Sequence, residues 1–502
     1  MAHGIADRAQ SDPDAIAISD GGVELSWRQL NQRLNRLVNL LLSLDIPAGE
    51  RIAVLGENSA HTAVAHLGVT YAGASAVPVN YHLTADEVGY ILADANARTV
   101  LCSARAADTA RAAAPDARVL AWGDNLEELL AESSVSEPSA RIAPAKPLYY
   151  TSGTTGRPKG VRLPDQMFPA GRSIAEMVAN IAASPMRSAG RHLVVAPMHH
   201  TGPLVGVRSM MAGTPVVVLP KFDAEQTLAV IETHRVEATM MVPTHFSRLL
   251  ALPAELRGRY DVSSLRSVVH TGAACPVPVK RAMIDWFGPI LNEAYGSTEI
   301  GTLTMIGSAE WLEHPGSVGR ALPGYELTIR DESGAALGPG AEGLVCARPL
   351  SGPGPSYHGD PEKTRRSHLG DGSFIVGEIG YLDDDGYLYL TDRASDLVVS
   401  GGVNVYPAES EAVLRTHPGV ADVAVIGVPH DDLGEQLCAL VQPAADTQVS
   451  ADELVAWTRD RLAHYKCPNI IEFTEGEIRT AMGKLDKRRL RREHLERAAA
   501  RS

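Results

Sequence analysis

The sequence has few cysteines and no long apolar run. The five cysteines, Cys102, Cys275, Cys346, Cys438 and Cys467, are scattered, and no two have metal-ligand spacing. This excludes a disulfide-stabilised secreted domain and a zinc ribbon, and it favours a reducing, cytoplasmic compartment. No apolar stretch is long enough to span a bilayer, and the N-terminus lacks the basic-then-apolar pattern of a secretory signal.

Positive charge is also in deficit. The 46 Lys and Arg residues are outnumbered by 60 Asp and Glu residues, which gives a net charge of −14. Such a chain binds nucleic acid or an anionic membrane poorly, so the basic stretch 486–501 is interpreted as a surface helix. The 502 residues predict two to four domains.

Alternating helix and strand patterns fill the first 130 residues. Ser26 and Thr84 precede segments with helical spacing, and short apolar strands are expected at 52–55, 76–79 and 99–101. This alternation predicts parallel βαβ units. Residues 133–147 are rich in Ser, Pro and Ala and predict a linker or surface loop.

Three further regions follow the linker. Residues 148–309 again have α/β character, with strand candidates at 193–196, 215–219 and 267–270. Short strands and Gly, Pro and Asp turns after Gly319 predict a β-rich subdomain. The last 105 or so residues predict a small α+β domain, with strands at 423–427 and 438–442 and a helix over 451–466.

The most informative stretch is residues 150–160. It combines hydroxyl, glycine and basic side chains at Thr151, Ser152, Gly153, Thr154, Thr155, Gly156, Arg157 and Lys159. Glycines let backbone N–H groups approach an anion closely, and hydroxyls and a lysine add donors and charge. A Walker A loop is excluded, because Pro158 precedes Lys159 and Gly160 follows it. The stretch therefore predicts a phosphate-binding loop.

This loop resembles the signature of the adenylate-forming superfamily, which includes acyl-CoA synthetases, adenylation domains of peptide synthetases and beetle luciferases. Further motifs of that family follow in order: Tyr295-Gly296-Ser297-Thr298-Glu299; Gly377-Glu378-Ile379-Gly380 with Asp392-Arg393; Gly401-Gly402-Val403-Asn404-Val405; Pro407-Ala408-Glu409; and Arg479-Thr480-Ala481-Met482-Gly483-Lys484. The resemblance covers the chain from about residue 150 onward. It implies a large N-terminal adenylate-forming domain over 1–394, of α/β subdomains plus a β-rich one, and a mobile α+β C-terminal domain over 395–502.

The resemblance also implies roles for individual residues. Tyr295 would stack on adenine, Glu299 with Thr155 would hold Mg²⁺, and Arg393 would bind ribose or phosphate. Lys484 would stabilise the negative charge that develops as a carboxylate attacks the α-phosphorus of ATP. The remaining nucleotide or coenzyme A contacts are expected at Gly272, Ala273, Ala274, Asn292, Glu293, Ala294, Gly296, Ser297, Thr298, Ile379, Gly401 and Gly402.

One motif position departs from the family. Glu378 stands where relatives have an aspartate that grips both ribose hydroxyls. The longer side chain keeps the charge, so either Glu378 still binds ribose with a small displacement, or nucleotide binding is altered. Asp396 matches the hinge about which the small domain turns.

The resemblance also implies that the acyl group lies near His199 and His200, with Gly202 and Gly206. His200 is preferred as the side chain that faces the substrate. Small residues in this region predict room for a bulky or extended apolar acid. Adjacent histidines diverge, so they do not form a metal site by themselves.

The implied reaction has two halves. ATP and a carboxylic acid give an acyl-adenylate, and coenzyme A then takes the acyl group after the small domain rotates. Two alternatives stay open: an acyl-AMP ligase that loads a carrier protein, and a catalytically silent nucleotide-binding regulator. An amino-acid adenylation domain is disfavoured, because no aspartate lies near His199 to bind an α-amine.

Overall fold

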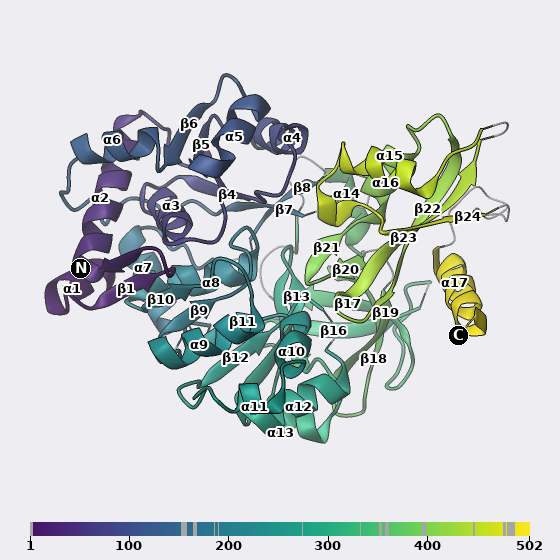
Figure 1. The fold of residues 1–502 in the computed structure, drawn as a ribbon. Helices are drawn as coiled ribbons and strands as arrows, with labels where there is room; N and C mark the ends of the chain where they lie inside the picture. Colours follow the sequence, from purple (N-terminus) through teal and green to yellow (C-terminus); the bar gives the residue numbers. More distant parts are fainter. Residues whose placement is uncertain are drawn as a thin grey trace.

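The structure is a computed structural model of the chain (Figure 1). It describes residues 4–151, 158–163, 168–184, 186–188, 190–273, 275–331, 333–350, 354–356, 361–393, 398–444, 447–474, 478 and 487–501. No helix among these residues is both long and apolar enough to cross a membrane.

The first α/β layer is a four-stranded parallel sheet of order β4-β3-β5-β6. Its strands are β3 (Arg51–Leu55), β4 (Ser75–Val79), β5 (Thr99–Ser103) and β6 (Arg118–Trp122). Helices α2 (Trp27–Ser43), α3 (Ala60–Tyr71) and α4 (Ala85–Ala95) pack in this layer, and Ser26 and Thr84 cap α2 and α4. The predicted βαβ units are confirmed.

A nine-stranded sheet forms the second layer, in the order β15-β14-β13-β12-β11-β9-β10-β1-β2. The strands β9 (His192–Val194), β10 (Val216–Val218), β11 (Ala238–Met241), β12 (Ser267–His270) and β13 (Leu291–Ser297) run parallel. β14 (Gly301–Gly307) and β15 (Arg320–Ala321) continue the sheet antiparallel. The far edge is β1 (Ile16–Ser19) and β2 (Glu24–Ser26), which come from the N-terminus.

A β-rich subdomain follows residue 319, as the turn pattern predicts. The strands β16 (Tyr325–Arg330), β17 (Gly343–Pro349), β18 (Phe374–Leu382) and β19 (Leu388–Arg393) form an antiparallel meander. Its apolar face packs around Leu327, Val345 and Phe374. Residues 133–147, all of them described, contain no helix or strand, in agreement with the predicted linker.

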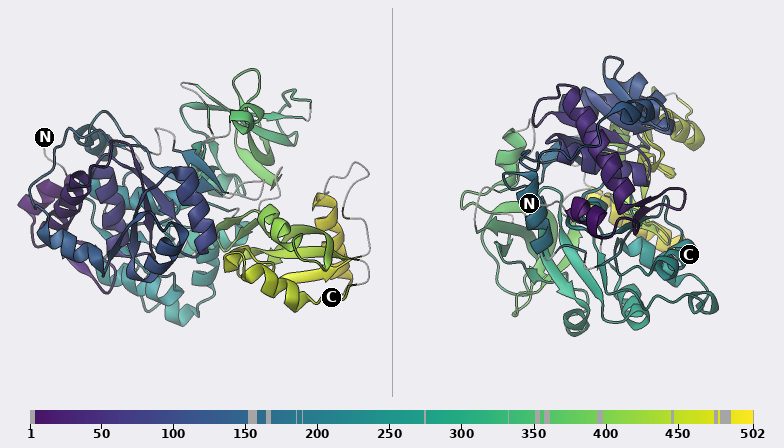
Figure 2. Two further views of the ribbon diagram at one scale, coloured as in Figure 1. Left: turned by 90° about the horizontal axis from the view of Figure 1, so that it is seen from above. Right: turned by 90° about the vertical axis from the view of Figure 1, so that its left-hand side faces the viewer.

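The C-terminal domain is α+β, as expected. Its strands are β20 (Val398–Ser400), β21 (Val403–Val405), β22 (Val420–His430), β23 (Gly434–Pro443) and β24 (Ile470–Phe473), and its helices are α15 (Pro407–Leu414), α16 (Ala451–Arg459) and α17 (Lys487–Arg501). Seen from above, this domain and the β16–β19 meander project from the same side of the two α/β layers (Figure 2).

The expected helix over 451–466 is too long. α16 ends at Arg459, and a single 3₁₀ turn, η3 (His464–Lys466), follows. Leu462 and Ala463 are buried between the two segments. Packing of this turn against the large domain therefore overrides the local helical pattern.

The other described elements surround these layers. They are α1 (Gly4–Ser11), η1 (Ala104–Ala106), α5 (Ala107–Ala113), α6 (Asn125–Glu132), β7 (Leu148–Thr151), β8 (Lys159–Arg162), α7 (Ile174–Ala183), α8 (Thr201–Ser209), η2 (Met210–Ala212), α9 (Ala224–His234), α10 (Pro243–Leu250), α11 (Ala254–Arg257), α12 (Val277–Phe287), α13 (Ser308–Glu313) and α14 (Pro361–Ser367).

Candidate active site

A cavity of about 2130 Å³ opens at the carboxyl ends of the parallel strands of the nine-stranded sheet. The segments that follow β9, β10, β11 and β12, and the end of β13, all contribute to its wall. In open α/β sheets, ligands bind in the crevice outside the carboxyl ends of the strands. The cavity also reaches β18 and the β20–β21 loop of the C-terminal domain.

The expected nucleotide motif lies on one wall. Of the residues predicted there, the lining includes Gly272, Ala273, Glu293, Ala294, Tyr295, Gly296, Ser297, Thr298, Glu299 and Glu378. Asn292 and Ile379 are not among the lining residues. The Tyr295 hydroxyl donates a hydrogen bond of 2.8 Å to Glu378 Oε2, so β13 and β18 meet at this point. Glu378 thus contacts the hydroxyl of the tyrosine that is expected to stack on adenine.

A buried ion pair is attached to β13 near its start, at Glu293. Lys280 Nζ lies 2.5 Å from Glu293 Oε2, and both side chains are almost completely buried. Burial raises the pKa of Glu293 and lowers that of Lys280, while each partner opposes the shift of the other. Lys280 also lies over the Trp311 ring. Sequence reasoning missed Lys280, although a lysine within the apolar segment Val277–Phe287 is a signal for a buried partner.

The expected acyl pocket lies at the start of α8. His200 and Gly202 line the cavity together with apolar side chains, whereas His199 is not among the lining residues. The Nε2 atom of His200 is buried and has no hydrogen-bond partner among the described residues. Burial lowers the pKa of His200 to about 4, so its ring is neutral at pH 7.

The two glycines of α8 permit close packing. A Cβ atom at Gly202 would lie 2.5 Å from Met240 Sδ, and one at Gly206 would lie 2.2 Å from His192 Nε2. Gly206 does not line the cavity. Glycine here therefore lets α8 approach its neighbours, and the room for an acyl group comes from other parts of the wall.

The β20–β21 loop brings two predicted glycines to the cavity. Gly401 and Gly402 have φ angles of +58° and +83°. A Cβ atom at Gly402 would lie 2.9 Å from Val242 Cγ2, just after β11 of the large domain. Glycine is required here by both the backbone conformation and the close approach between domains.

Several predicted residues lie outside the described part of the chain. They are Ser152, Gly153, Thr154, Thr155, Gly156, Ala274, Asp396 and Lys484, together with the side chains of Thr151 and Arg393. Lys159 begins β8, which pairs antiparallel with β7 on the other side of the predicted phosphate loop. The functional assignments of these residues stay predictions.

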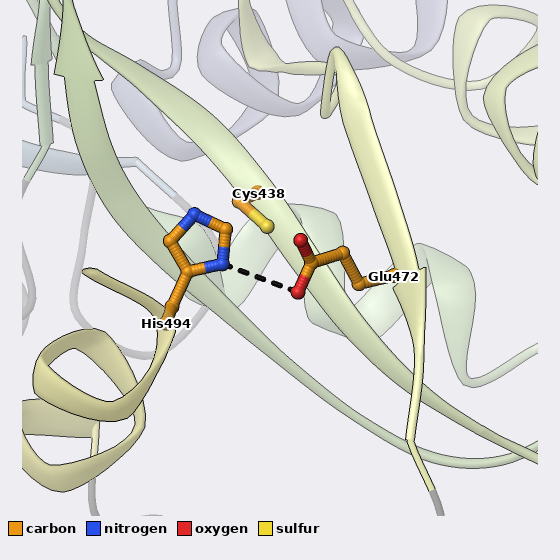
Figure 3. Close-up of side chains that lie close together, drawn as sticks. All are labelled: Cys438, Glu472 and His494. Atoms are coloured by element: carbon orange, nitrogen blue, oxygen red, sulfur yellow. Dashed lines mark hydrogen bonds and ion pairs between the residues drawn. The ribbon is translucent and has the colours of Figure 1, made fainter. Parts of the chain in front are cut away.

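A separate cluster joins α17 to the C-terminal sheet. Donor atoms of Cys438, Glu472 and His494 lie within 4.8 Å of one another, and His494 Nδ1 is 3.1 Å from Glu472 Oε2 (Figure 3). Arg497 lies 3.7 Å from the same carboxylate oxygen. Burial raises the pKa of the Cys438 thiol to about 12, so a protonated thiol and an already paired carboxylate disfavour metal binding. These contacts instead attach α17 to β23 and β24.

Known proteins resemble the chain along most of its length. Residues 5–354 match the AMP-binding enzyme family, and residues 409–484 match the AMP-binding enzyme C-terminal domain. A feruloyl-CoA synthase from an Amycolatopsis species is 34% identical over 492 residues, covering 97% of each chain. Among solved structures, the amide bond synthetase McbA from Marinactinospora thermotolerans has a TM-score of 0.84, with 30% identity and coverage of 98% and 99% of the two chains.

One relative has been solved in two complexes. The o-succinylbenzoate CoA synthetase MenE from Bacillus subtilis, as a double mutant bound to a product analogue, has a TM-score of 0.83 with 27% identity and 97% coverage of both chains. The same enzyme with its acyl-adenylate intermediate has a TM-score of 0.63, with 26% identity and 98% coverage of both chains. Taken with the motifs and the cavity, these matches show that the chain belongs to the AMP-binding enzyme family, in the acyl-CoA synthetase branch of the adenylate-forming superfamily.

Proposed function

We propose that the chain is an acid–thiol ligase that converts a carboxylic acid and ATP into an acyl-adenylate and pyrophosphate. Coenzyme A then takes the acyl group and AMP leaves. One observation carries the proposal. A single cavity joins the wall with Tyr295 and Glu378, the pocket with His200, and the loop with Gly401 and Gly402.

The nucleotide would bind along the end of β13. Tyr295 would stack on adenine, and the Glu378 carboxylate, which accepts a hydrogen bond from Tyr295, would bind ribose. Glu299 lines this part of the cavity, and a single carboxylate suits Mg²⁺, which relies largely on water and substrate phosphates. Glu299, with Thr155, would hold the ion, which neutralises phosphate charge. The phosphates would be cradled by residues 151–159.

The two halves of the reaction would use different orientations of the small domain. Lys484 would stabilise the first transition state. Gly401 and Gly402 would line the path of the thiol in the second. The described arrangement already has Gly402 beside Val242, and it resembles MenE with a product analogue more closely than MenE with an acyl-adenylate. These observations support assigning it to the thioester-forming half.

The acid is proposed to be bulky or extended and apolar. The wall of the cavity that His200 lines also contains Met186, Val195, Val205 and Met240. Methionine is flexible and polarisable, so it adapts to varied apolar groups. The similarity to a feruloyl-CoA synthase supports aromatic acids as the first candidates. The neutral ring of His200 favours a hydrogen bond to the substrate over charge pairing.

Incubation with ATP, Mg²⁺, coenzyme A and a pooled panel of aromatic, fatty and alicyclic acids tests the proposal by mass spectrometry. The expected products are AMP, pyrophosphate and one acyl-CoA. Acyl-adenylate without thioester would instead support a carrier protein as acceptor. ATP binding with no AMP from any acid would contradict the ligase assignment and favour a nucleotide-binding regulator.

A further inference from the structure

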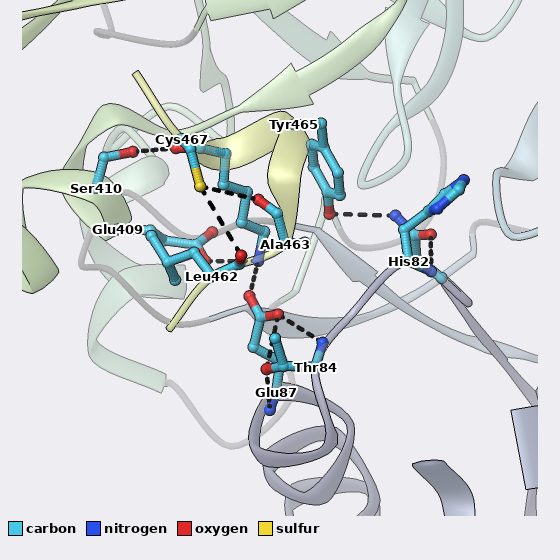
Figure 4. Close-up of polar contacts among 11 residues, drawn as sticks. His82, Thr84, Glu87, Glu409, Ser410, Leu462, Ala463, Tyr465 and Cys467 are labelled. Carbon is cyan, nitrogen blue, oxygen red and sulfur yellow. Dashed lines mark hydrogen bonds and ion pairs between the residues drawn. The ribbon is translucent and has the colours of Figure 1, made fainter. Parts of the chain in front are cut away.

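A buried ion pair connects the two domains away from the cavity. Lys466, in η3 of the small domain, lies 2.8 Å from Glu87 Oε1 in α4 of the large domain. The same ammonium lies 2.7 Å from Glu409 Oε2, in α15 of its own domain. Figure 4 shows Glu87 and Glu409 facing each other across the domain boundary.

Glu87 is also held in place by hydrogen bonds within its own helix cap. Its Oε2 atom accepts hydrogen bonds from the backbone N–H of Thr84, at 2.9 Å, and from the Thr84 hydroxyl, at 3.1 Å. Thr84 and Glu87 thereby form the capping box of α4. Because one oxygen is held by the cap, the other is presented to Lys466 with little loss of side-chain entropy.

The surroundings exclude most water. The side chains of Lys466, Glu87 and Glu409 are 3%, 13% and 5% exposed. Ala463 packs into the same apolar cluster as residues of α4, and Tyr465 packs against its edge. An ion pair in such a site is much less screened than one on the surface.

Two further polar contacts cross the same boundary. Asn80 Nδ2 donates a hydrogen bond of 3.1 Å to the Tyr465 hydroxyl. Arg248, in α10 of the large domain, makes two hydrogen bonds to the carboxylate of Asp432 in the small domain, at 2.8 and 2.7 Å. The Arg248 pair is more exposed, so it contributes less per contact.

The two carboxylates on Lys466 differ in one respect. Glu409 belongs to the same domain as Lys466, whereas Glu87 belongs to the other. Rotation of the small domain separates Glu87 from Lys466 but leaves the Lys466–Glu409 pair intact. The lysine therefore keeps a counter-charge in both orientations, which avoids the large penalty of an unpaired buried charge.

We propose that Glu87 and Lys466 form a reversible latch that holds the small domain in its thioester-forming orientation. This inference rests on the proposed two-step function. Glu87 is then a positioning residue, and it precedes Lys484 by almost 400 positions in the sequence. It sets the relative populations of the two orientations of the small domain, one for each half-reaction.

The Glu87→Gln variant tests the latch. Glutamine preserves the capping box, because it serves equally at this position, but it removes the charge that faces Lys466. We expect thioester formation from supplied acyl-adenylate to slow by about tenfold, as loss of a hydrogen bond between charged groups implies. Pyrophosphate–ATP exchange should be unchanged or faster.

A matched control is Glu176→Gln. Glu176 is the third residue of α7, after the N-cap Ser173, just as Glu87 is the third residue of α4 after the N-cap Thr84. Its ion pair with Arg172 lies within the large domain. This control should leave both half-reactions unchanged. Tyr465→Phe, which removes the bond to Asn80, should shift the balance in the same direction as Glu87→Gln, by a smaller factor.

Hydrogen–deuterium exchange gives a readout that needs no catalysis. Peptides covering residues 83–92 and 462–467 should exchange faster in Glu87→Gln than in the unmodified protein, and unchanged exchange would overturn the latch. Equal slowing of both half-reactions in Glu87→Gln, with unchanged melting temperature, would also overturn it. Failure of the proposed function would appear separately, as absence of AMP formation in the unmodified protein.

Discussion

Gly402→Ala should slow the second half-reaction selectively. At a φ of +83°, alanine is strained, and this strain is internal to the β20–β21 loop. The added Cβ would lie 2.9 Å from Val242 Cγ2, and this contact exists only when the loop is at the cavity. Overpacking of this kind costs about 1–3 kcal/mol, which corresponds to a factor of roughly 5 to 150 in rate.

Two single-step assays separate the effects. Thioester formation from supplied acyl-adenylate should fall within that range, while pyrophosphate–ATP exchange should change little. Gly386→Ala is the matched control, since Gly386 has a φ of +81° with open space around it. Adding Val242→Ala to Gly402→Ala should restore part of the lost rate. Equal losses in both assays, or no recovery in the double variant, would refute the reasoning.

Three other perturbations have defined outcomes. Glu378→Asp and Tyr295→Phe each remove the 2.8 Å hydrogen bond between β13 and β18, so both should raise the KM for ATP several-fold; an unchanged KM would show that the bond does not position the ring. Lys280→Met leaves Glu293 buried without its counter-charge and should destabilise the protein by about 3–5 kcal/mol, measured by urea unfolding, with Lys280→Met/Glu293→Gln recovering part of the loss. Because burial lowers the pKa of His200 from 6.5 to about 4, the unfolded chain binds the extra proton between these values; this contribution to stability is complete above pH 6.5 and is lost as the pH falls toward 4. Between pH 7 and pH 5, the free energy of unfolding of His200→Asn should therefore fall by less than that of the unmodified protein, with a difference on the order of 2 kcal/mol. An equal fall in both proteins would contradict a buried, neutral His200.

Local patterns were sufficient for much of the architecture. The caps at Ser26 and Thr84, the apolar strands of the first layer and the turn-rich meander are encoded within short segments, so they could be predicted directly. The order of motifs in the family resemblance also predicted that the residues of β13 and the β20–β21 loop serve one site, and the cavity contains both.

Long-range packing accounts for what the sequence did not reveal. The pairing of β1 with β10 joins segments almost 200 positions apart, and no local pattern indicates it. The end of α16 at Arg459 depends on docking of Tyr465 and Lys466 against the large domain. The space beside Gly206 is filled by His192, so a glycine in the sequence could not be equated with room for substrate.

Isotope transfer tests the central claim most directly. A carboxylic acid accepted by the protein, labelled with ¹⁸O in its carboxyl group, is converted with ATP and coenzyme A, and the AMP and pyrophosphate are analysed by mass spectrometry. Attack of the carboxylate on the α-phosphorus predicts one ¹⁸O atom in AMP and none in pyrophosphate. Label-free AMP, or label in inorganic phosphate released with ADP, would contradict the acyl-adenylate route.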